Sequence, residues 1–314
     1  MKKVISLVIA LVLALSCVAA LAELSFGTGG EAGTYYAFGT VLAQYISEKA
    51  GLSITAVTSG GSADNIDNLD AGLRQLGFTQ NDVASYALNG IRLYDGEPIT
   101  SFTALAALYD ETVQLVTVNP DIKSVADLKG KVVSIGAAGS GVYFNALDFL
   151  AAYDMTEEDI VPQYLSFKDS AEQLKDAKID AAFVVAGAPT TAVTDLSIAR
   201  QVYLVSLSDE DIAKLQAISP AYSKTIIPAG TYDGIDEDIV TVGVKATIIA
   251  NEDVTEDEAY AIVSTIFENK DAIAQQHAKG LELDLEYASS CGLPYHPGAA
   301  KYFAEKGIEV QTAG

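Results

Sequence analysis

Strand-like and helix-like segments alternate along almost the whole chain, and this alternation limits the possible folds more than any other feature. The apolar run "LSFGT" at 24–28 precedes a helical pattern near 35–49, and "SITAVTS" at 53–59 precedes another. The order continues to a capped amphipathic pattern at 255–276. Strands that alternate with helices usually form a largely parallel sheet covered by helices. The sequence therefore predicts an α/β fold.

Two glycine-rich loops, at 27–33 and 136–141, each follow a strand and open a helix. The β-rich stretches 113–118 and 239–249 are candidates for strands that cross between two lobes. We expect a two-lobed clamshell in which each lobe is a mixed sheet flanked by helices, with the two crossings as its hinge. Both loops then face a shared cleft at the carboxyl ends of strands. The expected division is residues 1–22 as a signal peptide, 23–110 plus 225–314 as lobe I, and 111–224 as lobe II.

The first loop formally matches a dinucleotide-binding fingerprint through Gly27, Gly29 and Ala32. Such a site also needs an acid at the end of the second strand to hold the ribose. That strand ends in "VTSGGS", which contains no acid. We therefore expect no nicotinamide cofactor, and no other cofactor. The free N–H groups of a helix start suit an anionic ligand group instead.

The N-terminus has the features of an export signal. Lys2 and Lys3 precede an apolar stretch at 4–16, and Ala20-Leu21-Ala22 provides a small-residue cleavage site before Glu23. A lipid anchor at Cys17 is the less favoured alternative. After cleavage only Cys291 remains, so no intramolecular disulfide can form. The expected product is an extracytoplasmic protein, released by a cleavable signal peptide and monomeric.

The charge balance argues against nucleic acid as a partner. The chain has 42 acidic and 19 basic residues, a formal net charge of −23, whereas phosphate binding needs clustered Lys and Arg. The three arginines, Arg74, Arg92 and Arg200, lie outside the glycine loops. No arginine clamp for a carboxylate is therefore expected.

Other candidate clusters fit structural roles better than catalytic or metal-binding roles. Asp64, Asp67 and Asp70 recur at helical spacing, which is typical of a solvated helix face and does not match a calcium loop. His277 and His296 have no second ligand nearby in sequence, so no metal is expected. The residues around Ser140 do not form the G-x-S-x-G motif of a hydrolase. An exported α/β hydrolase for a small acidic substrate remains the alternative function.

Seven stretches, in the same order along the chain, resemble a known family. The chain is similar to TAXI-type solute-binding receptors of tripartite ATP-independent periplasmic (TRAP) transporters. The matching stretches are "TGGEAGTYY" (28–36), "TSGGSADNIDNL" (58–69), "LGFTQNDVASYALNG" (76–90), "SVADLKGKVVSIGAAGSG" (124–141), "IDAAFVVAGAP" (179–189), "IPAGTYDG" (227–234) and "GLPYHPGAAKYFAEKGI" (292–308).

This resemblance implies a non-enzymatic, periplasmic-binding-protein-like receptor. It would capture a small organic acid or amino acid, glutamate-like or a dicarboxylate, and deliver it to the membrane permease subunits of an ion-gradient-driven TRAP transporter. One departure from the family pattern is Glu31, where an uncharged residue is usual. We expect Glu31 to face outward, where it favours the helix start.

We expect backbone N–H groups at two helix N-termini, one from each lobe, to hold the anionic or zwitterionic ligand. Hydroxyl and amide side chains at strand ends would add hydrogen bonds, although Asp82 equally fits an N-cap. Only one of the adjacent Tyr35 and Tyr36 should face the cleft. The predicted binding residues are Gly30, Gly33, Thr34, Tyr35, Ser62, Gln80, Asp82, Gly139, Ser140, Gly141, Ala186 and Gly187.

Overall fold

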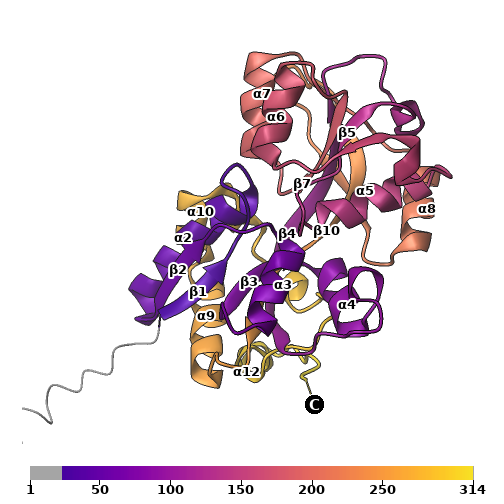
Figure 1. Cartoon of the computed structure of the whole chain (residues 1–314). Coiled ribbons are helices and arrows are strands. Elements are labelled where there is room, and N and C mark those ends of the chain that lie inside the picture. The colour runs from indigo at the N-terminus through magenta and orange to yellow at the C-terminus, as the bar shows by residue number, and fades with distance from the viewer. Residues whose placement is uncertain (1–22, 314) are drawn as a thin grey trace, which may run out of the picture.

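The computed structural model describes residues 23–313 (Figure 1). The expected signal peptide and Cys17 lie outside the described residues. Within residues 23–313, no helix combines the length and apolar character that crossing a membrane requires.

The strands of the described chain form one hydrogen-bonded sheet with the main order β2-β1-β3-β10-β4-β7-β5-β6. β1, β2 and β3 are parallel at one end, and β5, β6 and β7 are parallel at the other. Two further strands pair at the sides, β8 with β4 and β9 with β10. The strands are β1 (Glu23–Gly27), β2 (Ser53–Val57), β3 (Leu76–Gln80), β4 (Phe102–Thr117), β5 (Val132–Ser134), β6 (Val161–Gln163), β7 (Ala181–Ala186), β8 (Tyr203–Leu204), β9 (Ser223–Ile227) and β10 (Ile239–Asn251).

Two long antiparallel strands, β4 and β10, run through both halves of the molecule (Figure 1). One part of β10 pairs with β3, and its first five residues pair with β9. The second part of β4 pairs with β7. Each half is therefore a mixed sheet, parallel except where it meets a crossing strand. The predicted two-lobed α/β clamshell is confirmed, with its crossings in β4 and β10.

Helices cover the sheet in both lobes, and their ends follow local sequence signals. α9 begins after a capping box in which Thr255 and Glu258 satisfy each other's backbone N–H groups. α2 ends at Gly51, whose φ of 70° suits glycine. The helices are α2 (Thr34–Ala50), α3 (Ser62–Asp70), α4 (Asn81–Asn89), α5 (Val142–Ala151), α6 (Phe167–Lys175), α7 (Thr191–Ala199), α8 (Asp209–Ile218), α9 (Glu256–Glu268), α10 (Lys270–Gln276), α11 (Leu285–Ala288) and α12 (Pro297–Glu305), with short 3₁₀ turns η1 (Arg92–Tyr94), η2 (Val125–Leu128), η3 (Glu157–Asp159) and η4 (Ala278–Glu282).

The buried apolar residues separate into distinct clusters. The largest draws on residues 24–109 and 246–303, joined by Phe144. The two other clusters lie wholly within residues 113–244. Ile227, Tyr232 and Ile235 belong to one of these, so the segment after residue 225 packs with β7 and α7 rather than with the N-terminal core.

Candidate functional site

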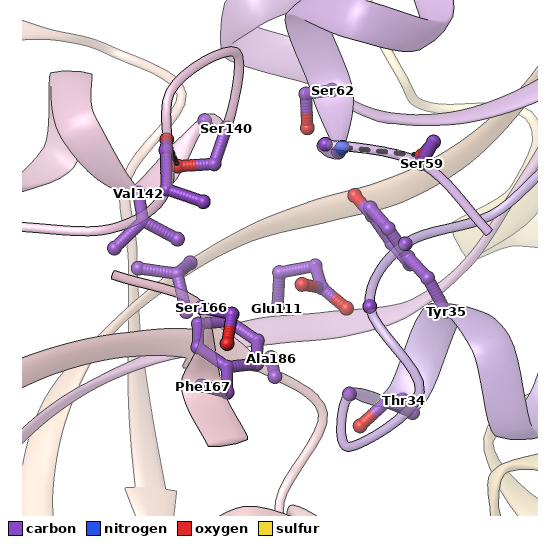
Figure 2. A pocket seen from close by; sticks show the side chains of 18 of the residues that line it. Thr34, Tyr35, Ser59, Ser62, Glu111, Ser140, Val142, Ser166, Phe167 and Ala186 are labelled. Carbon is purple, nitrogen blue, oxygen red and sulfur yellow. Dashed lines mark hydrogen bonds between the residues drawn. The ribbon is translucent and has the colours of Figure 1, made fainter. Parts of the chain in front are cut away.

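A pocket lies between the two lobes, with a cavity of about 90 Å³. Since one water needs roughly 10–15 Å³ on this measure, about six to nine waters or one amino-acid-sized molecule would fill it. Figure 2 shows side chains from both lobes around this space. The lining residues are Gly29, Gly30, Gly33, Thr34, Tyr35, Ser59, Gly60, Gly61, Ser62, Gln80, Glu111, Ala137, Ser140, Gly141, Val142, Leu165, Ser166, Phe167, Val185 and Ala186.

Three helices begin at this pocket with a glycine as the N-cap. Gly33 precedes α2, Gly61 precedes α3 and Gly141 precedes α5, and none of the three helix starts has a side-chain cap. Gly61 has a φ of 112°, a conformation that side chains strongly disfavour. The first-turn N–H groups of a helix have no partner within the helix and carry partial positive charge. The ends of α2 and α5 therefore offer donors to the pocket, whereas two first-turn N–H groups of α3 already donate to a carbonyl of the other lobe.

Hydrogen bonds between the lobes close the pocket at two sides. At one side, the Thr34 hydroxyl donates to the carbonyl of Gly187 at 2.7 Å. At the other, the N–H groups of Ala63 and Asp64 both donate to the carbonyl of Gly139, at 3.0 and 3.1 Å. The described conformation is thus a closed one.

A buried polar network joins the lobes beside the pocket. The Asn145 side-chain amide donates to the carboxylate of Asp82 at 3.0 Å and to the Tyr222 hydroxyl at 2.8 Å. Tyr222 donates to Asp148 at 2.9 Å, and Arg92 forms an ion pair with the other oxygen of Asp148 at 2.7 Å. Burial raises the pKa of Asp82 to about 6. This network contributes polar contacts to closure and gives Arg92 a structural partner.

Glu111 provides the only ionisable carboxyl group among the lining residues. It lies in the middle of β4, is 2% exposed, and projects into the pocket opposite Tyr35 (Figure 2). Its Oε1 atom, the Tyr35 hydroxyl and the Gln80 Oε1 atom are buried without a hydrogen-bond partner. Burial raises the pKa of Glu111 to about 8, although Tyr109 and Lys279 favour its charged form. Unpartnered buried polar atoms are costly, so a ligand that pairs with them is favoured.

Nine of the twelve predicted binding residues line this one pocket: Gly30, Gly33, Thr34, Tyr35, Ser62, Gln80, Ser140, Gly141 and Ala186. The other three lie beside it. Asp82 belongs to the buried network, and Gly139 and Gly187 contribute carbonyl groups to the contacts between lobes. Tyr35 lines the pocket whereas Tyr36 does not.

The remaining candidates have positions outside the pocket. Glu31 is exposed. Arg74 donates to Asn65, and Arg200 to the carbonyl of Lys175. Both histidines serve as N-caps, His277 for η4 and His296 for α12. Within residues 23–313, no three His, Cys, Asp or Glu side chains are grouped as a metal site would require.

Sequence reasoning missed several lining residues, above all Glu111. Its signal was an acidic residue inside the apolar stretch "LAALYDETVQLV" at 105–116, which is unusual for a strand that is buried along its length. Phe167, which lies against Gly33, carried no local signal. Its place in the pocket depends on how α6 approaches α2 from the other lobe.

Comparisons with known proteins agree with this architecture. The alkanesulfonate-binding protein SsuA from Xanthomonas axonopodis pv. citri, bound to MOPS, is 14% identical with a TM-score of 0.52, and 91% of each chain is covered. The GluR0 ligand-binding core from Nostoc punctiforme, in complex with L-glutamate, is 16% identical with a TM-score of 0.51, covering 83% of this chain and 100% of that one. A binding protein component of an ABC phosphonate transporter from Pseudomonas aeruginosa is 11% identical with a TM-score of 0.52, covering 83% and 79%. These matches show the periplasmic-binding-protein fold, and the model of the NMT1-like family matches residues 26–307.

Proposed function

Since the chain belongs to the NMT1-like family, we propose that it is an extracytoplasmic receptor for a small organic acid or amino acid. The observation that carries this proposal is the enclosed pocket between the lobes, where the uncapped N-termini of α2 and α5 meet from opposite lobes. An anionic group at such helix ends gains about 0.3–1 kcal/mol when exposed and up to about 2 kcal/mol when partly buried. The similar proteins named above bind or carry sulfonate, phosphonate or glutamate, all of which have an anionic group.

We propose that the lobes open and close around the ligand. In this proposal the boundaries lie within the crossing strands, so that residues 23–110 and 245–313 form lobe I and 111–244 form lobe II. The packing of Ile227, Tyr232 and Ile235 supports moving the boundary from 225 to 245. Small-angle scattering should give a smaller radius of gyration with ligand than without it.

We propose that the receptor acts by binding alone. A serine nucleophile needs a base within hydrogen-bond reach. In the described chain the Ser140 hydroxyl donates to the carbonyl of Ala137 at 2.7 Å, and neither histidine lines the pocket. These contacts favour a receptor over the hydrolase alternative.

We propose further that the receptor delivers its ligand to an ion-gradient-driven TRAP permease. This proposal rests on the resemblance of the seven stretches to TAXI-type receptors, whereas the phosphonate-binding neighbour named above serves an ABC transporter. Uptake of labelled ligand by cells that carry the receptor separates the two partners. Collapse of the ion gradients should abolish uptake through a TRAP permease, whereas loss of uptake only on ATP depletion would identify an ABC partner.

A thermal-shift screen of the purified protein against amino acids and organic acids tests the binding function. Ligand at a hundredfold excess over Kd stabilises the native state by about 2.7 kcal/mol, which is readily measured. Failure of every compound to raise the melting temperature would contradict the proposed ligand class. Turnover of esters or peptides would instead favour the hydrolase.

A further inference from the structure

The pocket offers hydrogen-bond donors at its helix ends and an acceptor oxygen at Glu111. This arrangement restricts the chemical class of the ligand as well as its size. The N-termini of α2 and α5 supply N–H donors, and in the part of the chain that the structure describes no Lys or Arg side chain lines the cavity. Within residues 23–313, the buried Oε1 atom of Glu111 has no hydrogen-bond partner. A ligand with only acceptors, such as a dicarboxylate dianion, would accept hydrogen bonds from the helix ends but would offer no donor to this oxygen, which would stay unpaired.

We propose that Glu111 receives the ammonium group of an α-amino acid whose carboxylate lies against the N-termini of α2 and α5. This inference rests on the proposed receptor function and narrows its ligand class. An ammonium group has three donors, which suits Glu111 together with the unpartnered Oε1 of Gln80 in the lining of the same pocket. A charge-assisted hydrogen bond of this kind contributes about ten- to hundredfold in affinity.

The groups around Glu111 determine whether its carboxyl group is ionised, and a cation in the pocket would change that balance. Tyr109 precedes it on β4, Tyr35 faces it from α2, Lys279 and Glu282 approach from η4, and Tyr287 from α11. The ammonium of Lys279 is engaged by Glu282 at 2.5 Å. Because burial raises the pKa of Glu111 to about 8, much of the free protein carries a neutral Glu111 at pH 7. A bound ammonium group would favour the ionised form, so the carboxyl proton leaves to solvent as the amino acid binds.

The direct experiment compares matched ligands that differ only in the amino group. Calorimetric titration at pH 7 would use L-glutamate with glutarate, L-leucine with 4-methylpentanoate, and L-alanine with propionate. In any pair that binds, the amino acid should bind at least tenfold more tightly. Equal or tighter binding of the acid without an amino group, or of any other donor-free acid, would overturn the ammonium assignment and leave the receptor function intact. If no amino acid and no organic acid binds, both the ammonium assignment and the proposed receptor function are contradicted.

Glu111→Gln tests the residue, with Glu237→Gln as the control because Glu237 is exposed on the loop before β10. Glu111→Gln should weaken amino-acid binding at least tenfold and leave the matched acid unchanged or tighter, whereas Glu237→Gln should change neither. Unchanged amino-acid affinity in Glu111→Gln would contradict the proposal. Circular dichroism verifies that each variant is folded.

A second readout needs no variant. Titration of the wild-type protein at pH 7, in buffers of different ionisation enthalpy, should show net proton release on amino-acid binding. Affinity should rise between pH 6 and pH 8. Absence of proton release, with affinity falling above pH 8, would show that a protonated Glu111 donates to a ligand anion instead.

Discussion

Helices α8 and α9 begin at Ser208 and Thr255, whose hydroxyls accept hydrogen bonds from their own helices, whereas α2, α3 and α5 begin at glycines beside the pocket. A side-chain cap stabilises a helix start by about 1 kcal/mol relative to alanine. α8 and α9 have such caps, whereas the glycines that begin the pocket helices forgo only a few tenths of a kcal/mol relative to them. At α2 and α5 the first-turn N–H groups beside the pocket are thereby left free for a ligand, at a small cost in local stability.

A carboxyl group in an outer capping box and the carboxyl group in the pocket differ in the same respect, namely whether the protein itself supplies their hydrogen-bond partners. Asp127 lies in the capping box of η2, where the Lys123 N–H and the Ser124 hydroxyl donate to it and lower its pKa. Glu111 is buried with an unpaired oxygen, and burial raises its pKa. Helix α6 combines the two situations, because its N-cap Ser166 lines the pocket and also accepts a hydrogen bond from its own helix. Proximity to the pocket alone therefore does not leave a helix end free.

The largest expected effect comes from removing the unpaired acid. Because the pKa of Glu111 is raised in the folded protein, its stabilising protonated state is fully present below about pH 4.5 and lost as the pH rises through about 8. Ligand-free Glu111→Gln should therefore be more stable than wild type by more than about 1.4 kcal/mol at pH 9, the value of one pKa unit. Urea unfolding from pH 5 to pH 9 measures the difference, which should grow up to pH 8. A constant difference would mean that Glu111 keeps its ordinary pKa.

The next effect comes from adding one methyl group at a pocket helix start. Gly141 has a φ of −69°, which alanine adopts readily, but a Cβ there would overlap the Oε1 of Gln80. The amide of Gln80 must move away, so Gly141→Ala should weaken ligand binding about tenfold, or about 1.4 kcal/mol. The melting temperature of the ligand-free variant should stay close to wild type. Undiminished affinity in calorimetric titration would show that Gln80 takes no part in binding.

The smallest effect is expected at an outer helix. Thr255→Ala removes the cap of α9 and should lower the free energy of unfolding by about 1 kcal/mol. Ligand affinity should be unchanged, because Thr255 does not line the pocket. Urea unfolding and calorimetric titration of the same sample measure the two quantities. A matching loss of affinity would show that the outer helix ends are coupled to the binding site.

The sequence predicted those parts of the site that depend on local signals. Glycines after strands predicted the loops around Gly33 and Gly141, and the strand end at Gln80 predicted its place at the cleft. The alternation of elements predicted the clamshell. Asp82 also follows a strand end, but Asn145 from the other lobe engages it in the buried network.

Contacts made at long range could not be predicted in this way. Phe167 reaches the pocket because α6 packs across from α2, and no local pattern encodes that approach. Glu111 sits in a strand whose other side chains are nearly all buried, and only the three-dimensional structure shows which of its neighbours face a cavity. The assignment of residues after 225 depended likewise on the pairing of β9 with β10.

The discontinuous core of the first lobe has a consequence for how the protein is made. A chain leaves the ribosome N-terminus first, yet the largest cluster needs residues 246–303 as well as 24–109. The clusters within 113–244 can be completed earlier, although they begin later. The lobe that is synthesised first is therefore completed last, because Phe38, for example, packs against His277 and α2 packs against α9. We expect nascent chains that end before α9 to depend on chaperones more strongly than the complete protein does.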